Sequence, residues 1–259
     1  MGAYLRTKTL MLAMLQQEWL PSTCVPTKEA LSSSLANAGV GRIAFLRHGA
    51  TSKQPTDGGV DFDRQLTNIG REQAQEAGSV FGPQFHPFFP TILVSPAPRT
   101  IETAKLFLNA ANQSEVQLQS DSILYDGTMQ PSGCLLFRKI GYSGLQDYLN
   151  CENDADQNVA RIVLGSYAHN VINIIMNVLQ QSEKTSTATG TSKETTLWMI
   201  GHAIYLPAVA LGIATILECA DKNLLLTTNT VEAEGYVIDN IHNSSVQLLQ
   251  RPQGSLLQN

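Results

Sequence analysis

Short apolar runs alternate with longer amphipathic stretches along most of this chain. The short runs predict strands over 43–46, 91–94, 116–119 with 123–125, and 196–200, and a terminal hairpin over 236–239 and 245–249. Apolar residues at helical spacing predict helices over 5–20, 31–38, 68–80, 98–108, 156–180 and 206–220. This alternation predicts an α/β fold, a three-layer α/β/α sandwich around a mostly parallel sheet.

The domain organisation follows from the same pattern. Residues 1–40 form an expected N-terminal helical extension, and residues 41–259 form the main domain. Within that domain, a stretch over about 182–196 is rich in Ser, Thr and Gly, which predicts a flexible insertion.

Three of the expected strands lead into side chains that suit an anion. Arg47 and His48 follow the first strand, and His202 follows the strand that ends near Gly201. Arg99 comes after the second strand, in the first turn of a helix, where free N–H groups already favour negative charge. Since ligands of open α/β sheets bind beyond the carboxyl ends of the strands, these residues predict a cationic site that holds two imidazoles.

Four stretches carry a resemblance to a known family. Leu46–Gly49, Leu66–Ala74, Ser95–Ala104 and Ile200–His202 resemble, in order, the successive motifs of the histidine phosphatase (phosphoglycerate-mutase-like) superfamily. The resemblance runs from about residue 42 to the C-terminus. The string from Asp61 to Thr67, together with the missing mutase glutamate, looks most like the phosphohistidine-phosphatase branch.

The resemblance implies a role for each residue of the cationic site. His48 is the implied nucleophile, which carries the phosphoryl group as a phosphohistidine. Arg47 and Arg99 are implied to bind the phosphate through their planar guanidinium groups. His202 is implied to donate to the transition state and to help fix the tautomer of His48, and Thr51 adds a hydroxyl contact. Neither a metal nor another cofactor is expected, because the arginines supply the positive charge that a metal ion would bring.

The general acid has two candidates in the sequence. Asp126 is the first, because it follows the expected strand 123–125, and Asp61 is the second. Each also suits a turn, and Asp126 precedes a glycine. A phosphoramidate has a good leaving group, so it suits a site without an obvious acid. Asp63 and Arg64 are expected to clamp their loop rather than to take part in catalysis.

Composition and charge exclude several other classes of protein. The net charge of −5, with no basic run, argues against nucleic-acid binding. The four cysteines are far apart and form no CxxC pair, which argues against a zinc knuckle or a disulfide framework. No apolar run reaches the ~20 residues of a membrane helix. We therefore expect a cytoplasmic protein without a membrane partner, with organelle targeting through residues 1–40 as the alternative.

The sequence favours a phosphatase that acts through phospho-His48 on a phosphorylated small molecule or a phosphoprotein. A phosphoglycerate-type mutase is the alternative enzyme. A non-catalytic scaffold that keeps the fold is the alternative from another class, against which the intact Arg47, His48, Arg99 and His202 argue.

Overall fold

The computed structural model describes residues 25–52, 61–126, 136, 139–141, 143–151, 153–185, 194–240 and 244–252. Its strands are β1 Val40–Arg47, β2 Thr91–Val94, β3 Gln117–Ser120, β4 Thr195–Gly201, β5 Gly235–Asp239 and β6 Ser245–Leu249. They form one six-stranded sheet in the order β3-β2-β4-β1-β5-β6. β3, β2, β4 and β1 run parallel, whereas β5 and β6 form the expected antiparallel hairpin at one edge. The predicted mostly parallel sheet is confirmed.

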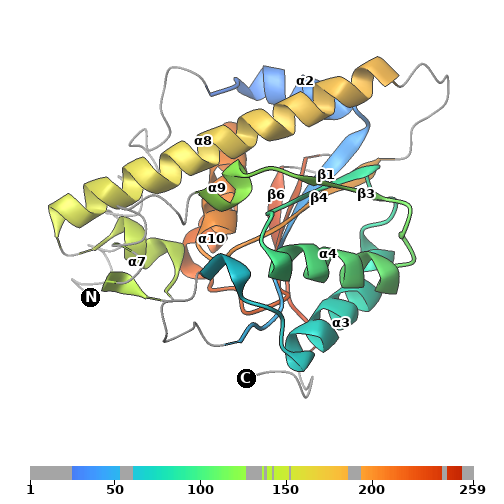
Figure 1. The fold of residues 1–259 in the computed structure, drawn as a ribbon. Helices are drawn as coiled ribbons and strands as arrows, with labels where there is room; N and C mark the ends of the chain where they lie inside the picture. Colours follow the sequence, from blue (N-terminus) through green and yellow to red (C-terminus); the bar gives the residue numbers. More distant parts are fainter. Residues whose placement is uncertain are drawn as a thin grey trace.

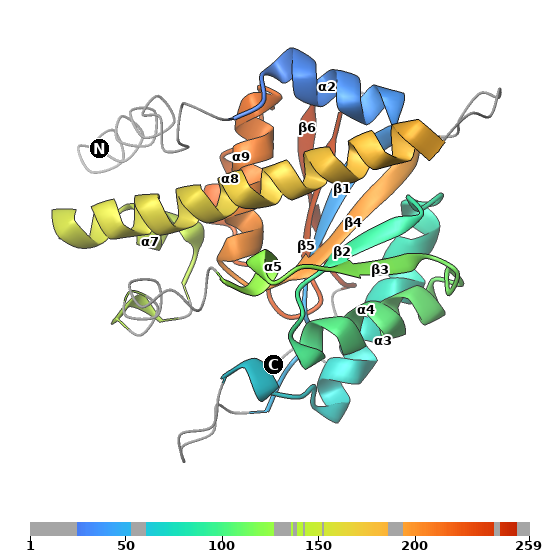
Figure 2. The same cartoon turned by 45° about the horizontal axis from the view of Figure 1, so that its top comes forward.

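Helices cover both faces of the sheet (Figures 1 and 2). The helical elements are α2 Lys28–Asn37, the 3-10 turn η1 Asp61–Asp63, α3 Asn68–Gln84, α4 Pro98–Ala110, α5 Ile123–Asp126, α7 Leu145–Leu149, α8 Asp154–Thr185, α9 Tyr205–Ile216 and α10 Leu224–Thr227. α3 and α4 lie on one face, and α2, α8 and α9 lie on the other. The structure is therefore the three-layer α/β/α sandwich that the sequence predicted.

The central strand β1 is apolar on both sides because it lies between two hydrophobic cores. Ile43 and Phe45 belong to the core beneath α2, α8 and α9, whereas Ala44 and Leu46 belong to the core beneath α3 and α4. A parallel strand buried between two helical layers needs this continuous apolar run. The two cores hold β1 rigidly, so the position of Arg47 at its end is well defined.

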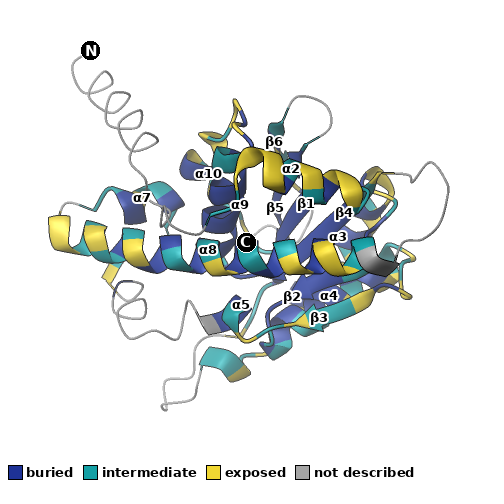
Figure 3. Cartoon of the chain, turned by 90° about the horizontal axis from the view of Figure 1, so that it is seen from above, coloured by how far each residue is buried: buried dark blue, intermediate teal, exposed yellow. Residues whose placement is uncertain are grey.

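Helix α8 is the longest helix of the described chain. Among the described residues, only its stretch Asp154–Glu183 is long and apolar enough to cross a membrane. However, 56% of its most apolar window is buried within the fold. In Figure 3, dark blue marks the buried residues of this helix between the teal and yellow ones. The buried face includes Leu164, Val171 and Ile175, all at most 1% exposed, as expected for a core helix.

Two expectations about local structure need correction. Residues 123–125 form part of helix α5 and not a strand, because the Asp121 side chain accepts the N–H of Ile123 at 2.9 Å and Tyr125 N–H bonds back to Ser122. The insertion expected over 182–196 is shorter, since α8 continues to Thr185 and β4 already begins at Thr195. The residues between 186 and 193 lie outside the described ones.

The expected N-terminal extension is described only from residue 25. Its second helix is present as α2, where Leu31 and Leu35 are fully buried against the α8 layer. The first expected helix, 5–20, lies outside the described residues. The predictions of a cytoplasmic location and of no nucleic-acid or membrane partner stay predictions.

Candidate active site

The parallel pairing of β1 and β4 brings the two imidazoles together. Arg47 lies opposite Gly201 in the register, so His48 and His202 leave the sheet side by side with their ring centroids 5.3 Å apart. Arg99, in the first turn of α4, reaches the same edge from β2. Arg47, His48, Arg99 and His202 are all buried, with exposures between 2% and 9%. The structure thus gathers these four residues at one point of the sheet.

Two glycines of separate motifs hold the loop after His48 in place. A Cβ atom on Gly49 would lie 2.2 Å from the carbonyl oxygen of Gly70, and one on Gly70 would lie 2.0 Å from that of Ala50. Only glycine permits this approach of two backbones. Gln73 of α3 adds a side-chain oxygen that accepts the Ala50 N–H at 2.8 Å. The second motif therefore supports the first one structurally and does not reach the reacting atoms.

The tautomer of His48 follows from its main-chain partner. Nδ1 of His48 lies 2.7 Å from the carbonyl oxygen of Gly49, which can only accept, so Nδ1 carries the proton and Nε2 keeps its lone pair. Burial, followed by His202, Arg47 and Arg99, holds the pKa of His48 well below its ordinary value. The ring is therefore neutral at physiological pH and its Nε2 is nucleophilic. Gly49 therefore fixes this tautomer, and the expected help from His202 stays a prediction.

His202 lies between a hydroxyl group and a guanidinium. Its Nε2 is 2.8 Å from Ser95 Oγ, and its Nδ1 is 3.5 Å from Nη2 of Arg99. Since a guanidinium only donates, Nδ1 carries no proton and Nε2–H donates to Ser95. Burial, then Arg99, Arg47 and Arg64, lowers the pKa of His202 well below its ordinary value. The expected donation to a phosphate thus requires a protonated ring or a displaced Arg99.

Both terminal nitrogens of Arg99 bind to one residue of η1. Nη1 donates to the Asp61 carbonyl oxygen at 2.7 Å, and Nη2 donates to the Asp61 carboxylate at 2.8 Å. Nε of Arg99 is buried and has no hydrogen-bond partner among the described residues. The fork of Arg99 is therefore fixed at one edge, while Nε–H remains as a donor for an anionic ligand.

Arg47 is held in a similar way by the loop 228–234, which leads into β5. Its Nη1 donates to the carbonyl oxygen of Thr230 at 2.9 Å, and its Nη2 donates to Glu232 Oε1 at 2.8 Å. The sequence offered no sign of this loop, because Thr230 and Glu232 lie far from every motif and follow no periodic pattern.

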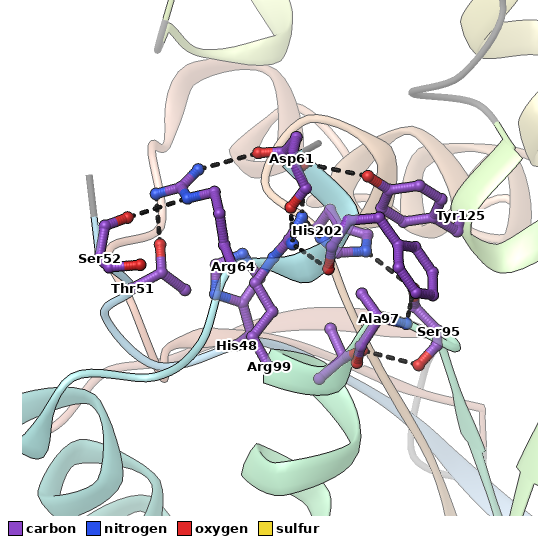
Figure 4. A network of polar contacts seen from close by, with 12 residues as sticks. His48, Thr51, Ser52, Asp61, Arg64, Ser95, Ala97, Arg99, Tyr125 and His202 are labelled. Carbon is purple, nitrogen blue, oxygen red and sulfur yellow. Dashed lines mark hydrogen bonds and ion pairs between the residues drawn. The ribbon is translucent and has the colours of Figure 1, made fainter. Parts of the chain in front are cut away.

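Asp61 connects three side chains, as Figure 4 shows. Besides Arg99, it accepts from Arg64 Nη1 and from the Tyr125 hydroxyl, both at 3.1 Å. Burial alone would raise the pKa of Asp61, but Arg99, Arg64 and Tyr125 together hold that pKa below its usual value. Arg64 is thus paired with Asp61 rather than with Asp63, which corrects the expected clamp. Its Nη2 also donates to the hydroxyl of Thr51, so the expected phosphate contact of Thr51 stays a prediction.

Residues 43–125 match the family model of the histidine phosphatase superfamily, branch 1, a span that contains Arg47, His48 and Arg99. The resemblance to the histidine phosphatase superfamily is confirmed. No curated protein matches the chain.

The solved structures of a mutase and of several phosphatases are similar to this chain. They include a phosphoglycerate mutase from Bacillus anthracis, with 17% identity, coverage of 82% of this chain and 92% of that one, and a TM-score of 0.48. SixA from Agrobacterium tumefaciens, assigned as a phosphohistidine phosphatase, has 15% identity, coverage of 81% and 96%, and a TM-score of 0.46. The mycobacterial glucosyl-3-phosphoglycerate phosphatase Rv2419c, complexed with inorganic phosphate, has 17% identity, coverage of 82% and 98%, and a TM-score of 0.47.

Two further points concern the candidate site. Asp126 ends helix α5, next to Tyr125, but its side chain lies outside the described set, so its role as an acid stays a prediction. In the part of the chain that the structure describes, no group of three or more His, Cys, Asp and Glu side chains is arranged to hold a metal ion.

Proposed function

We propose that the protein is a phosphatase that transfers a phosphoryl group first to Nε2 of His48 and then to water. The observation that carries the proposal is the state of His48. This residue is a neutral imidazole whose Nδ1–H is bound to Gly49, and the positive charges of Arg47 and Arg99 act on it. Such a ring is a competent nucleophile, and splitting the transfer into two steps makes each one easier.

In the first step, the Nε2 lone pair attacks phosphorus and forms a P–N bond. The bond from phosphorus to the leaving group breaks, and the leaving group takes the electron pair and a proton from solvent water. The charge of the transferring group spreads over its oxygens, where the N–H groups of Arg47 and Arg99 stabilise it. In the second step, water attacks phosphorus, breaks the P–N bond and releases inorganic phosphate, which restores neutral His48.

The state of Asp61 supports a leaving group that needs little help from an acid. Asp61 is ion-paired with Arg99 and Arg64, and its lowered pKa keeps it ionised at neutral pH. An ionised carboxylate has no proton to give. We therefore propose a phosphohistidine side chain of a phosphoprotein as the substrate, because its leaving imidazole is good. A phosphorylated small molecule is the alternative, with Asp126 as the acid.

The test compares hydrolysis of an aryl phosphate, an alkyl phosphate and a phosphohistidine peptide by the wild type and its variants. We expect His48→Ala to be inactive on all three and to form no acid-labile phosphoenzyme. Exposed His86, changed to Asn, is the control and should behave like the wild type. Asp61→Asn and Asp126→Asn show which of the two carboxyl groups acts as the general acid. Loss of the acid should slow hydrolysis of the alkyl phosphate most, because its leaving group is the poorest of the three.

Activity that survives His48→Ala would contradict the proposed nucleophile. A strong preference for the alkyl phosphate, lost in Asp126→Asn, would contradict phosphohistidine as the substrate and favour the small molecule. Isomerisation of a phosphoglycerate that depends on a bisphosphoglycerate would instead favour the mutase.

A further inference from the structure

The loop 228–234 holds Arg47 and belongs to none of the four motifs of the chain. It brings the Thr230 carbonyl oxygen and the Glu232 carboxylate to the two terminal nitrogens of Arg47, at 2.9 and 2.8 Å. Arg47 immediately precedes the proposed nucleophile, and its side chain in this ion pair is only 11% exposed. A guanidinium fixed at two nitrogens cannot rotate about its last bonds, so Glu232 contributes to the direction of the whole fork.

The loop is attached directly to the end of β1. Arg47 N–H donates to the Glu234 carbonyl oxygen at 2.9 Å, and Ala233 N–H donates to the Arg47 carbonyl oxygen at 3.2 Å. The next residue, Gly235, begins β5 with no room for a side chain, since a Cβ atom there would lie 1.7 Å from the Phe45 carbonyl oxygen. Loop 228–234 thus holds Arg47 at both its backbone and its guanidinium.

The backbone of this loop also contains a strained residue. Ala233 is fully buried and has a φ of 57°, in the left-handed region that L-residues avoid at a cost of about 1–2 kcal/mol. Such a conformation persists only where the surrounding structure determines it, and it is common at functional sites. Here the strained residue follows Glu232 directly, and its N–H donates to the Arg47 carbonyl oxygen at the end of β1.

We propose that Glu232 is a positioning residue that orients Arg47 toward the phosphoryl group during its transfer to His48. This inference rests on the proposed function. Its consequence differs from that of a simple structural contact, because the carboxylate has two opposing effects. It holds the fork in place, which matters most in the transition state, and it partly neutralises Arg47, which weakens binding of an anion in the ground state.

The test uses Glu232→Ala, Glu232→Gln and a matched control, Glu102→Gln. Glu102 also pairs with an arginine, Arg71, and has 32% side-chain exposure compared with 31% for Glu232. Within the described part of the chain, its identified hydrogen bond and ion pair are with Arg71 and not with the four residues of the site. For all four proteins, kcat, melting temperature and the dissociation constants of inorganic phosphate and of vanadate are measured. Phosphate reports ground-state binding, whereas vanadate adopts the trigonal-bipyramidal geometry of the transition state.

We expect kcat and vanadate affinity to fall together in Glu232→Ala, by up to about 100-fold, since a misplacement of about 1 Å costs that much. Phosphate affinity and melting temperature should stay close to those of the wild type. In Glu232→Gln, kcat and vanadate affinity should lie between those of the wild type and of Glu232→Ala, because the amide oxygen still accepts from Nη2 of Arg47. Glu102→Gln should match the wild type.

The proposal is overturned if Glu232→Ala keeps the wild-type kcat and vanadate affinity. It is also overturned if phosphate and vanadate affinities fall equally, since Glu232 then only maintains the structure. A wild type that binds vanadate but hydrolyses none of the phosphorylated substrates contradicts only the proposed function. The ratio of vanadate affinity to phosphate affinity still tests the role of Glu232. A wild type that binds neither anion contradicts both.

Discussion

Along with burial, Arg47 and Arg99 both lower the pKa of His48, and each is held by a main-chain carbonyl oxygen and by one carboxylate. For Arg47 these belong to Thr230 and Glu232, and for Arg99 both belong to Asp61. The carboxylates are equally accessible, at 31% and 32% side-chain exposure. They differ in what else they hold, because Asp61 also binds Arg64 and Tyr125. Asp61 therefore maintains a network, whereas the identified contact of Glu232 serves one arginine.

The network around Asp61 extends into the helical layer of the fold. Tyr125 lies edge-on to His202, with ring centroids 5.3 Å apart, and its ring faces the Arg99 guanidinium at 5.8 Å. Tyr167 of α8 donates to the Leu124 carbonyl oxygen at 3.0 Å and so anchors the helix that carries Tyr125. A disturbance at Asp61 should thus reach Arg99, Arg64 and His202 together. One at Glu232 should stay with Arg47.

Loss of Arg99 should produce the largest effect. Arg99→Ala removes a donor to the transferring phosphoryl group and leaves Asp61 without its main partner, and we expect kcat to fall about 10²–10³-fold. Arg99→Lys should restore little, because an ammonium cannot reproduce the planar fork. Steady-state kinetics on an aryl phosphate tests this, with Arg71→Ala on the surface of α3 as the control. Activity within tenfold of the wild type would show that Arg99 does not act on the phosphoryl group.

The next largest effect separates the two carboxylates by stability. Asp61→Asn keeps the shape of the side chain but removes the charge that two guanidinium groups and a hydroxyl share. We expect the free energy of unfolding to fall by about 1–3 kcal/mol. Glu232→Gln should change it much less, because the retained amide oxygen still accepts from Arg47. Urea unfolding of both variants measures the difference, and equal losses would contradict the view of Asp61 as the centre of a network.

The same comparison explains which parts of the site the sequence predicts. Buried strands end at Arg47 or lead directly into His48 and His202, and a helix begins next to Arg99. Periodicity alone therefore places these four residues at one edge of a sheet. Asp61 and Glu232 come from a short turn and a loop, whose partners depend on tertiary contacts. Residues 123–125 were mispredicted for a related reason, since the Asp121 side chain overrides the strand preference of Ile123. Ser95 lay within a motif, but only the structure shows that its hydroxyl faces His202.

Acid should affect the two histidines before it affects Asp61. The pKa values of His48 and His202 lie well below the unfolded value near 6.5, and burial is the largest cause of both shifts. Below about pH 6.5 the unfolded chain binds more protons, so the free energy of unfolding should fall by about 1.4 kcal/mol per pH unit for each histidine. The lowered pKa of Asp61 delays its contribution, which is lost only as pH falls through its folded value, below 3.8.

Unfolding measured between about pH 7.5 and pH 5 tests this order. His48→Asn should roughly halve the slope, because one of the two buried titrating rings is gone. A wild-type stability that stays constant over this range would show that neither ring is protected from protonation in the folded protein.

The smallest effect concerns the backbone that presents Glu232. Ala233→Gly releases about 1–2 kcal/mol of left-handed strain. This gain is offset by the loss of a buried methyl group, worth about 0.8 kcal/mol, and by the greater backbone entropy of glycine, about 0.5–1 kcal/mol. Stability should therefore change little, while the loop gains freedom and kcat falls a few-fold. Asn112→Gly, at a φ of 55° away from the site, is the control and should leave kcat unchanged. If Ala233→Gly also leaves kcat unchanged, the contacts of Glu234 and Gly235 with β1 suffice to direct Arg47, and the strain at Ala233 has no part in it.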